Sequence, residues 1–155
     1  MTEYEVIPHV GVGPAKLGAL RIEVRAAMPG EPSSFSKGLE PDHETDAWHN
    51  SAFQVFYTGD PPRAEYIELS GGCDIRAFYK RMSVFDTPAD EAVAMVERDA
   101  PYDRNNPELG YSYSFPALDL CLWREIIPDS PDTEYGLAFC TIGIGVKGYC
   151  SKLSV

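Results

Sequence analysis

Residues 86–98, Asp-Thr-Pro-Ala-Asp-Glu-Ala-Val-Ala-Met-Val-Glu-Arg, have the pattern of an amphipathic α-helix with a marked beginning. Thr87 can cap the first turn through its hydroxyl group, Pro88 suits the first helical position because no amide donor is needed there, and Asp90 stands in the capping-box position. The apolar residues that follow at helical spacing form one stripe: Ala89, Ala92, Val93 and Val96. A helix with such a stripe needs an apolar surface against which it is buried.

Segments on both sides of this helix supply that surface, because apolar and polar residues alternate in them as they do in half-buried strands. The predicted strands are 53–58, 64–70, 110–115, 118–123 and 139–146. The turn residues at 59–62 join the first two strands as a hairpin. The sequence therefore predicts an antiparallel sheet that packs against the helix.

The N-terminal part predicts a short strand at 4–10 and a second helix at 17–28, which Pro29 and Gly30 end. Between Gly30 and Asn50 the apolar residues follow neither a helical nor a strand period, so a long loop is expected there. Together these elements predict an α+β fold, with two main helices packed on one face of an antiparallel sheet. We expect a single domain over 1–155, with 11–70 and 84–146 as a possible degenerate tandem repeat of helix and strands.

The composition narrows the classes of function. The chain has 155 residues and a formal net charge of −11, which argues against nucleic acid and favours a basic partner. No apolar run is long enough to span a membrane. The four cysteines, Cys73, Cys121, Cys140 and Cys150, show no metal-knuckle spacing. We therefore expect free thiols, a cytoplasmic location and no cofactor.

Residues 17–24, Leu-Gly-Ala-Leu-Arg-Ile-Glu-Val, resemble the Leu-Gly-Met-Thr-x-x-Glu-Val helix start of small helix-plus-sheet proteins. These include the beta-lactamase inhibitory protein family and the BamE-type lipoproteins, and the whole chain resembles small actinobacterial proteins of this plan. Ala19 and Leu20 depart from the pattern, which has Met and Thr there. The resemblance implies a binding scaffold whose sheet receives a partner, and it supplies no functional residue.

Side chains alternate between the two faces of a strand, so the predicted sheet divides into two sets. The set expected to face the helices is Phe53, Val55, Tyr57, Ile67, Leu69, Tyr111, Tyr113, Phe115, Leu118, Leu120, Leu122, Ile142, Ile144 and Val146. The opposite face mixes large aromatic residues with small polar ones, which suits a binding groove. The candidate binding residues on it are Phe56, Tyr66, Ser112, Ser114, Cys121, Trp123 and Thr141. A solvated face with scattered aromatic residues is the alternative.

Two other arrangements of polar residues bear on possible sites. Asp42, His43, Glu44, Asp46 and His49 form the only cluster of histidine and carboxylate side chains. Their spacing matches no metal motif with a known mechanism, so we expect a solvated loop without a metal. The chain has no Gly-x-Ser-x-Gly elbow and no complete phosphate loop.

The sequence thus favours a non-catalytic binding module of the inhibitor or immunity type. It would recognise a protein or a small-molecule ligand through the open sheet face. The alternative is a small enzyme or ligand carrier with a pocket on the same face, where Cys121 or a tyrosine hydroxyl would be the reactive group. The sequence does not indicate an oligomeric state.

Overall fold

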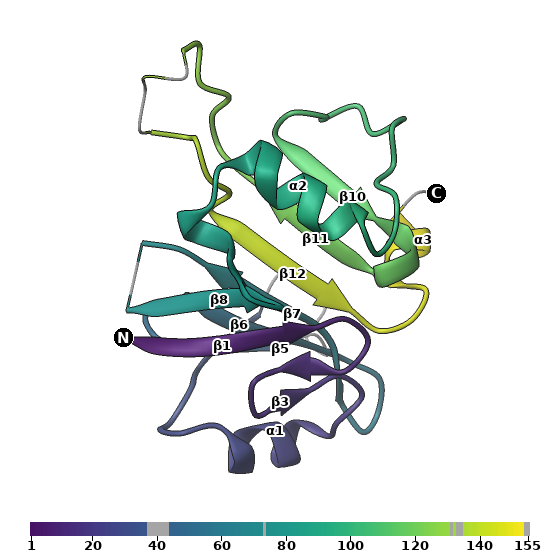
Figure 1. Cartoon of the computed structure of the whole chain (residues 1–155). Helices are drawn as coiled ribbons and strands as arrows, with labels where there is room; N and C mark the ends of the chain where they lie inside the picture. The colour runs from purple at the N-terminus through teal and green to yellow at the C-terminus, as the bar shows by residue number, and fades with distance from the viewer. Residues whose placement is uncertain (37–43, 73, 131, 133–134, 154–155) are drawn as a thin grey trace.

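The computed structural model describes residues 1–36, 44–72, 74–130, 132 and 135–153 (Figure 1). Within these ranges the chain forms a seven-stranded sheet in the order β10-β11-β12-β7-β6-β5-β4. Its strands are β4 (Ser33–Ser36), β5 (Glu44–Trp48), β6 (Phe53–Thr58), β7 (Arg63–Ser70), β10 (Ser112–Phe115), β11 (Leu120–Trp123) and β12 (Thr141–Gly145). All neighbours in this sheet pair antiparallel.

A smaller sheet has the order β3-β2-β1-β8-β9 in the described residues. Its strands are β1 (Thr2–Ile7), β2 (Gly11–Val12), β3 (Ala15–Lys16), β8 (Ile75–Tyr79) and β9 (Met82–Ser83). β1 and β8 pair in parallel. The helices are α1 (Arg21–Ala27), α2 (Ala89–Glu97) and α3 (Tyr149–Leu153), with single 3-10 turns at Val84–Asp86 and Pro116–Leu118. The predicted α+β class is confirmed.

One face of the large sheet carries the core. α1, the small sheet and α2 cover it, and Figure 1 shows α2 in front of β10 and β11 with β1 in front of the middle strands. The ring of Tyr4 on β1 meets the ring of Phe53 on β6, with 4.8 Å between their centroids. The stripe predicted for α2 is buried in the same hydrophobic cluster as Ile67 and Leu122. The core therefore lies between this face and the elements that cover it.

The hairpin of β6 and β7 confirms the alternation seen in the sequence. Phe53 pairs with Leu69 and Val55 with Ile67, all four fully buried. The same alternation runs through β10, β11 and β12. Tyr111 is an exception, since it precedes β10 and is 43% exposed. Its expected place against the helices is therefore wrong.

The starts of both predicted helices need correction. α1 begins at Arg21 because Gly18 has a positive φ of 80° and the preceding residues form the β2–β3 hairpin. α2 begins at Ala89, and its start has no side-chain cap. The hydroxyl of Thr87 donates instead to the carbonyl oxygen of Ser83 at 2.7 Å.

The prediction of a long loop between Gly30 and Asn50 is wrong, because this segment contains β4 and β5. They pair with each other and extend the sheet beyond β6. The sequence here is too polar to show a strand pattern, because a charged residue, Asp46, faces the core from β5 together with Trp48. Arginine side chains of α1 neutralise Asp46. Residues 37–43 lie outside the described residues.

The other face of the large sheet is partly covered by α3, which the sequence did not predict. Tyr149 and Cys150 of α3 lie against β7 and β11 through contacts with Tyr66 and Cys121. Across the described residues no helix is long and apolar enough to cross a membrane. The tandem repeat and the single-domain assignment stay predictions.

Candidate functional site

The seven candidate binding residues lie on one face of the large sheet, opposite the core. The pairing register places Ser114 beside Cys121, and Cys121 beside Gly143. The next row towards the other end of these strands holds Ser112, Trp123 and Thr141. The third group is aromatic: Phe56 and Tyr66 pair across β6 and β7. α3 lies over this face between the aromatic pair and the serine and cysteine row.

The aromatic side chains hold α3 on the sheet. The rings of Tyr66 and Tyr149 stack with centroids 4.7 Å apart, and Phe56 meets Tyr66 at 5.8 Å. Tyr66 reaches across β12 because residue 143 is glycine, and a Cβ there would lie 1.8 Å from the tyrosine hydroxyl. Burial raises the pKa of Tyr66, so the phenol stays neutral. These aromatic rings are therefore engaged in packing and do not line an open groove.

Asp119 fixes the chain that leads into α3. It has a left-handed φ of 48° and is buried. Its carboxylate accepts hydrogen bonds from the backbone amides of Gly148 at 3.0 Å and Cys150 at 2.9 Å, and lies 2.8 Å from His9 Nε2. Burial opposes ionisation, but the hydrogen bonds from Cys150 and His9 outweigh it and lower the pKa of Asp119. An ionised carboxylate thus sets the position of Cys150.

A cavity of about 610 Å³ opens beside α3 on this face. Its walls come from β10, β11, α3 and the loop before β10, and the lining residues are Asp103, Asn105, Asn106, Pro107, Glu108, Ser112, Ser114, Cys121 and Cys150. Three of the candidate binding residues, Ser112, Ser114 and Cys121, thus share one cavity. Ligand pockets commonly enclose about 300–1,000 Å³, so this cavity can hold a side chain or a small molecule.

Hydrogen bonds hold the loop at 103–108 against β10. The amide of Asp103 donates to the carbonyl oxygen of Ser114 at 2.8 Å, and Asn106 Nδ2 donates to the carbonyl oxygen of Ser112 at 3.2 Å. Asp103 Oδ1 accepts from the amide of Asn105 at 2.9 Å. The loop therefore presents amide and carboxylate groups to the cavity from a defined backbone.

The charge of the cavity is negative. Asp103 and Glu108 line it, and no lysine, arginine or histidine is present among the described residues of its wall. The nearby Arg104 is engaged outside it, where it pairs with Glu97 and lies over the ring of Tyr102 at 4.0 Å. The arrangement suits a positively charged group and disfavours an anion.

Two thiols meet in the cavity wall. Cys121 Sγ lies 3.8 Å from Cys150 Sγ and 3.8 Å from Ser114 Oγ. The hydrogen bond from Cys150 outweighs burial, with help from Ser114, and lowers the pKa of Cys121. The same hydrogen bond, followed by burial, raises the pKa of Cys150. Of the two thiols, Cys121 is therefore the one that loses its proton more readily.

No histidine among the described residues stands beside this pair to act as a general base. His9 bonds to Asp119, and His49 Nε2 lies 2.7 Å from the hydroxyl of Tyr4. Neither lines the cavity. The constellation of nucleophile and imidazole that acyl transfer uses is thus missing from the described residues of this site.

Trp123 and Thr141 lie in the same row as Ser112, but only Ser112 lines the cavity. Trp123 is 42% exposed on β11, and its neighbours Ser112 and Thr141 flank it. These two candidate residues therefore border the cavity without lining it.

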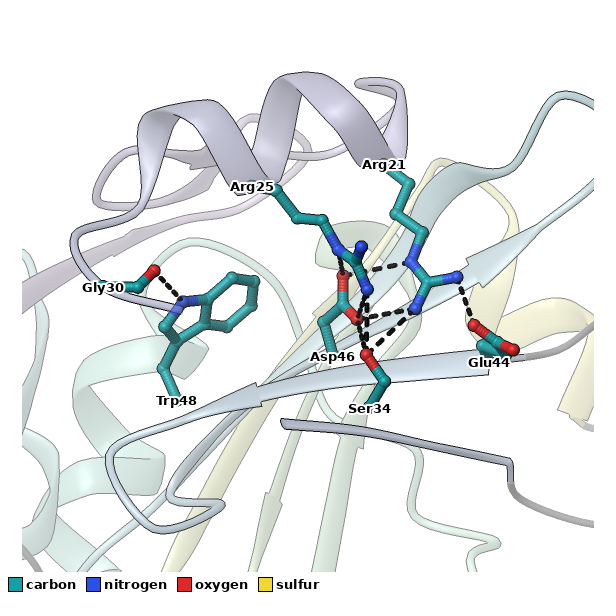
Figure 2. Close-up of polar contacts among 7 residues, drawn as sticks. All are labelled: Arg21, Arg25, Gly30, Ser34, Glu44, Asp46 and Trp48. Carbon is teal, nitrogen blue, oxygen red and sulfur yellow. Dashed lines mark hydrogen bonds and ion pairs between the residues drawn. The ribbon is translucent and has the colours of Figure 1, made fainter. Parts of the chain in front are cut away.

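The histidine and carboxylate cluster of the sequence does not assemble as a metal site in the described residues, and Asp42 and His43 lie outside them. Figure 2 shows Asp46 between Arg21 and Arg25 of α1, with Ser34 beside it. Glu44 pairs with Arg21 at 2.5 Å. His49 points to Tyr4 instead. The carboxylates of Glu44 and Asp46 therefore anchor α1 to β5.

Sequence reasoning missed the part of the cavity that comes from Asp103, Asn105, Asn106, Glu108 and Cys150. The four loop residues stand in a run of turn formers, a pattern that by itself indicates only the exit of a helix. Cys150 follows the last predicted strand, and its segment is too short to show a helical period. The closely spaced polar side chains of Asp103, Asn105 and Asn106 were the only local signal.

Comparisons with known proteins identify no relative: no family model, no curated protein and no solved structure matches the chain.

Proposed function

We propose that the protein is a non-catalytic binding module that receives a basic side chain of a protein partner in the cavity on the open sheet face. The observation that carries this proposal is the lining of the cavity, which contains two carboxylates and no described cation. A net charge of −11 adds a long-range attraction for a basic partner. The same charge disfavours nucleic acid.

The geometry supports recognition of an arginine or lysine head group. Glu108 is exposed at the rim, and Asp103 is half-buried. One oxygen of Asp103 is used by the loop, which leaves its other oxygen for a ligand. Amides of Asn105 and Asn106 and the hydroxyl of Ser114 add polar groups around the same space. Bordering this space, Trp123 offers an exposed ring for contact with the partner's surface.

Several features support binding rather than catalysis. Cys121 has no described histidine beside it, and the cavity wall has no other described base apart from the two carboxylates. The resemblance of residues 17–24 to the helix start of inhibitory helix-plus-sheet scaffolds agrees with a sheet that receives a partner. A cytoplasmic location, which free thiols favour, belongs to the same proposal.

The test is a titration with a triarginine peptide, followed by two-dimensional amide NMR. We expect shifts at 103–106 and at Glu108, Ser112, Ser114 and Cys121, and these shifts should weaken as salt rises because the Debye length shrinks. A triglutamine peptide of the same length is the matched control. Equal shifts with both peptides, or shifts confined to the opposite face, would refute the proposal.

Variants sharpen the test. Asp103→Asn keeps the acceptor that the amide of Asn105 uses, so it removes charge without breaking the turn. Glu108→Gln removes the other carboxylate. Each is expected to weaken triarginine binding by up to about fivefold, the range of exposed charge pairs. Glu91→Gln on α2 is the control with the same net charge, and its binding should stay within experimental error of the unmodified protein.

A further inference from the structure

We propose that Cys121 and Cys150 are a redox modification site, at which a hydroperoxide such as hydrogen peroxide converts the two thiols into a reversible disulfide. The site shares the cavity wall with the proposed binding site. It does not depend on a ligand there, because the reacting groups both belong to this chain.

Two elements that are far apart in sequence, β11 and α3, meet at this pair of cysteines. Cys121 stands on β11 in the interior of the large sheet, between β10 and β12. Cys150 stands on the short helix α3, and the sulfur atoms are 3.8 Å apart. A disulfide bond is about 2.05 Å long, so the sulfur atoms must approach by roughly 1.8 Å. Side-chain rotation and a small shift of α3 can supply this movement.

The two cysteines differ in their access to solvent, and formation of a disulfide by peroxide requires one accessible cysteine and one partner beside it. Cys121 lines the cavity and is partly exposed, so a peroxide molecule can reach it. Cys150 is 3% exposed, and its sulfur shares a hydrogen bond with the sulfur of Cys121. The thiolate is the form of cysteine that attacks peroxide. Cys121 is therefore the residue that reacts first, and Cys150 is the resolving residue.

The atoms and electrons balance in two steps. The Cys121 thiolate attacks one oxygen of hydrogen peroxide, the O–O bond breaks, and the hydroxide released takes a proton to leave as water; Cys121 becomes a sulfenic acid. The sulfur of Cys150 then attacks the Cys121 sulfur, the S–O bond breaks, and the hydroxide leaves with the proton of Cys150 as a second water. The two thiols are oxidised by two electrons, and the peroxide is reduced by two.

Cys140 provides an internal comparison. It is a free cysteine directly before β12, and its sulfur contacts the carbonyl oxygen of Trp123 at 3.5 Å and the hydroxyl of Thr141 at 3.9 Å. Among the described residues no thiol lies beside it, so the described part of the chain offers Cys140 no resolving partner. Cys73 lies outside the described residues.

The experiment uses the full chain and its Cys73→Ser/Cys140→Ser double variant, which keeps the proposed pair alone. Treated with an equimolar amount of hydrogen peroxide, the double variant should lose two hydrogen atoms in intact mass, and its free thiols should fall from two to none. Dithiothreitol should restore both. Peptide mapping should join the peptides that contain Cys121 and Cys150.

Cys150→Ser tests the order of the steps. Without the resolving thiol, Cys121 should stop at the sulfenic acid, which dimedone traps. Circular dichroism checks that this variant is folded; if it is not, the double variant alone decides. Two thiols that persist in the double variant, or a bond that forms only between molecules, would overturn the proposal. The test contains no basic peptide, so its failure is distinct from failure of the binding proposal.

Discussion

The salt bridge that ties α1 to β5 offers the sharpest test of the fold. Asp46 is fully buried and accepts bonds from four guanidinium nitrogens: Arg21 Nε at 3.1 Å, Arg21 Nη2 at 2.7 Å, Arg25 Nε at 2.8 Å and Arg25 Nη2 at 2.7 Å. The hydroxyl of Ser34 donates to it at 2.8 Å. Asp46→Asn keeps the size of the side chain and removes its charge. Two neighbouring arginines then lack their shared counter-ion (Figure 2).

The expected cost follows from the exposure of each partner. Removal of one partner from a buried ion pair costs about 3–5 kcal/mol of unfolding free energy. The Arg21 side chain is 18% exposed and that of Arg25 is 41% exposed, so Arg25 can turn to solvent and relieve part of the loss. We therefore expect a cost of about 3 kcal/mol, at the lower end of that range. With a urea slope of about 2 kcal/mol/M, the midpoint of unfolding falls by roughly 1.5 M.

Urea unfolding followed by tryptophan fluorescence measures this change, since Trp48 lies on the same strand and its indole donates to the carbonyl oxygen of Gly30. Glu44→Gln is the matched control. Glu44 also pairs with Arg21, but its side chain is 47% exposed, so its loss should cost less than about 1 kcal/mol. Equal destabilisation by Asp46→Asn and Glu44→Gln would refute the reasoning, as would a cost for Asp46→Asn no larger than that of an exposed pair.

The same carboxylate sets a pH dependence. Burial opposes ionisation, but hydrogen bonds from Arg25, Arg21 and Ser34 outweigh it and hold the pKa of Asp46 below its ordinary value. The unfolded chain therefore takes up the proton first as pH falls. The contribution of Asp46 to stability is present above about pH 4 and is lost as pH falls from there towards its folded pKa. Asp46→Asn should flatten the stability profile in this window.

Three further changes test how α3 is held and how its position affects stability. Gly143→Ala places a Cβ at 1.8 Å from the hydroxyl of Tyr66, so the ring must move, and we expect a loss of about 1–3 kcal/mol with faster hydrogen exchange in α3; unchanged exchange would contradict this packing. Asp119→Ala should lower the free energy of unfolding, measured by heat or urea, by about 2–3 kcal/mol, because it leaves two backbone amides without their acceptor. Asp119→Asn should cost less, because asparagine tolerates the left-handed φ and keeps an acceptor oxygen. The oxidised Cys121–Cys150 form, which closes a loop of roughly 30 residues, should gain about 3 kcal/mol over the reduced form in the absence of dithiothreitol; equal stability would show that the bond strains the sheet.

Much of the fold was predictable because local periods carry it. In the β6–β7 hairpin, alternation assigned Phe53, Val55, Ile67 and Leu69 to the core face, and all four are fully buried. In α2, helical spacing predicted the apolar stripe in the same way, and its residues are buried. β4 and β5 were not predicted, because Asp46, a charged residue, occupies a core-facing position and interrupts the expected pattern of apolar residues. A carboxylate is buried there only because α1 brings two arginines to it, which no local pattern reveals.

The candidate site was likewise predicted in part. Alternation placed Ser112, Ser114 and Cys121 together on the face away from the core, and the cavity includes all three. It also placed Phe56 and Tyr66 on that face, but it could not show that Tyr149 would cover them. The loop at 103–108 is held at the cavity by hydrogen bonds to β10, and no periodic pattern in the sequence indicates such bonds.

For β6, β7, β10, β11 and β12, the sequence by itself determined which side turns towards the core, because the side-chain period of a strand is a property of neighbouring residues. Only the tertiary structure decided what covers each face. α3 lies on the supposedly open face because the Asp119 carboxylate, 31 residues away along the chain from Cys150, accepts the amide of that residue. Contacts between such distant residues made the cavity and brought its two thiols together.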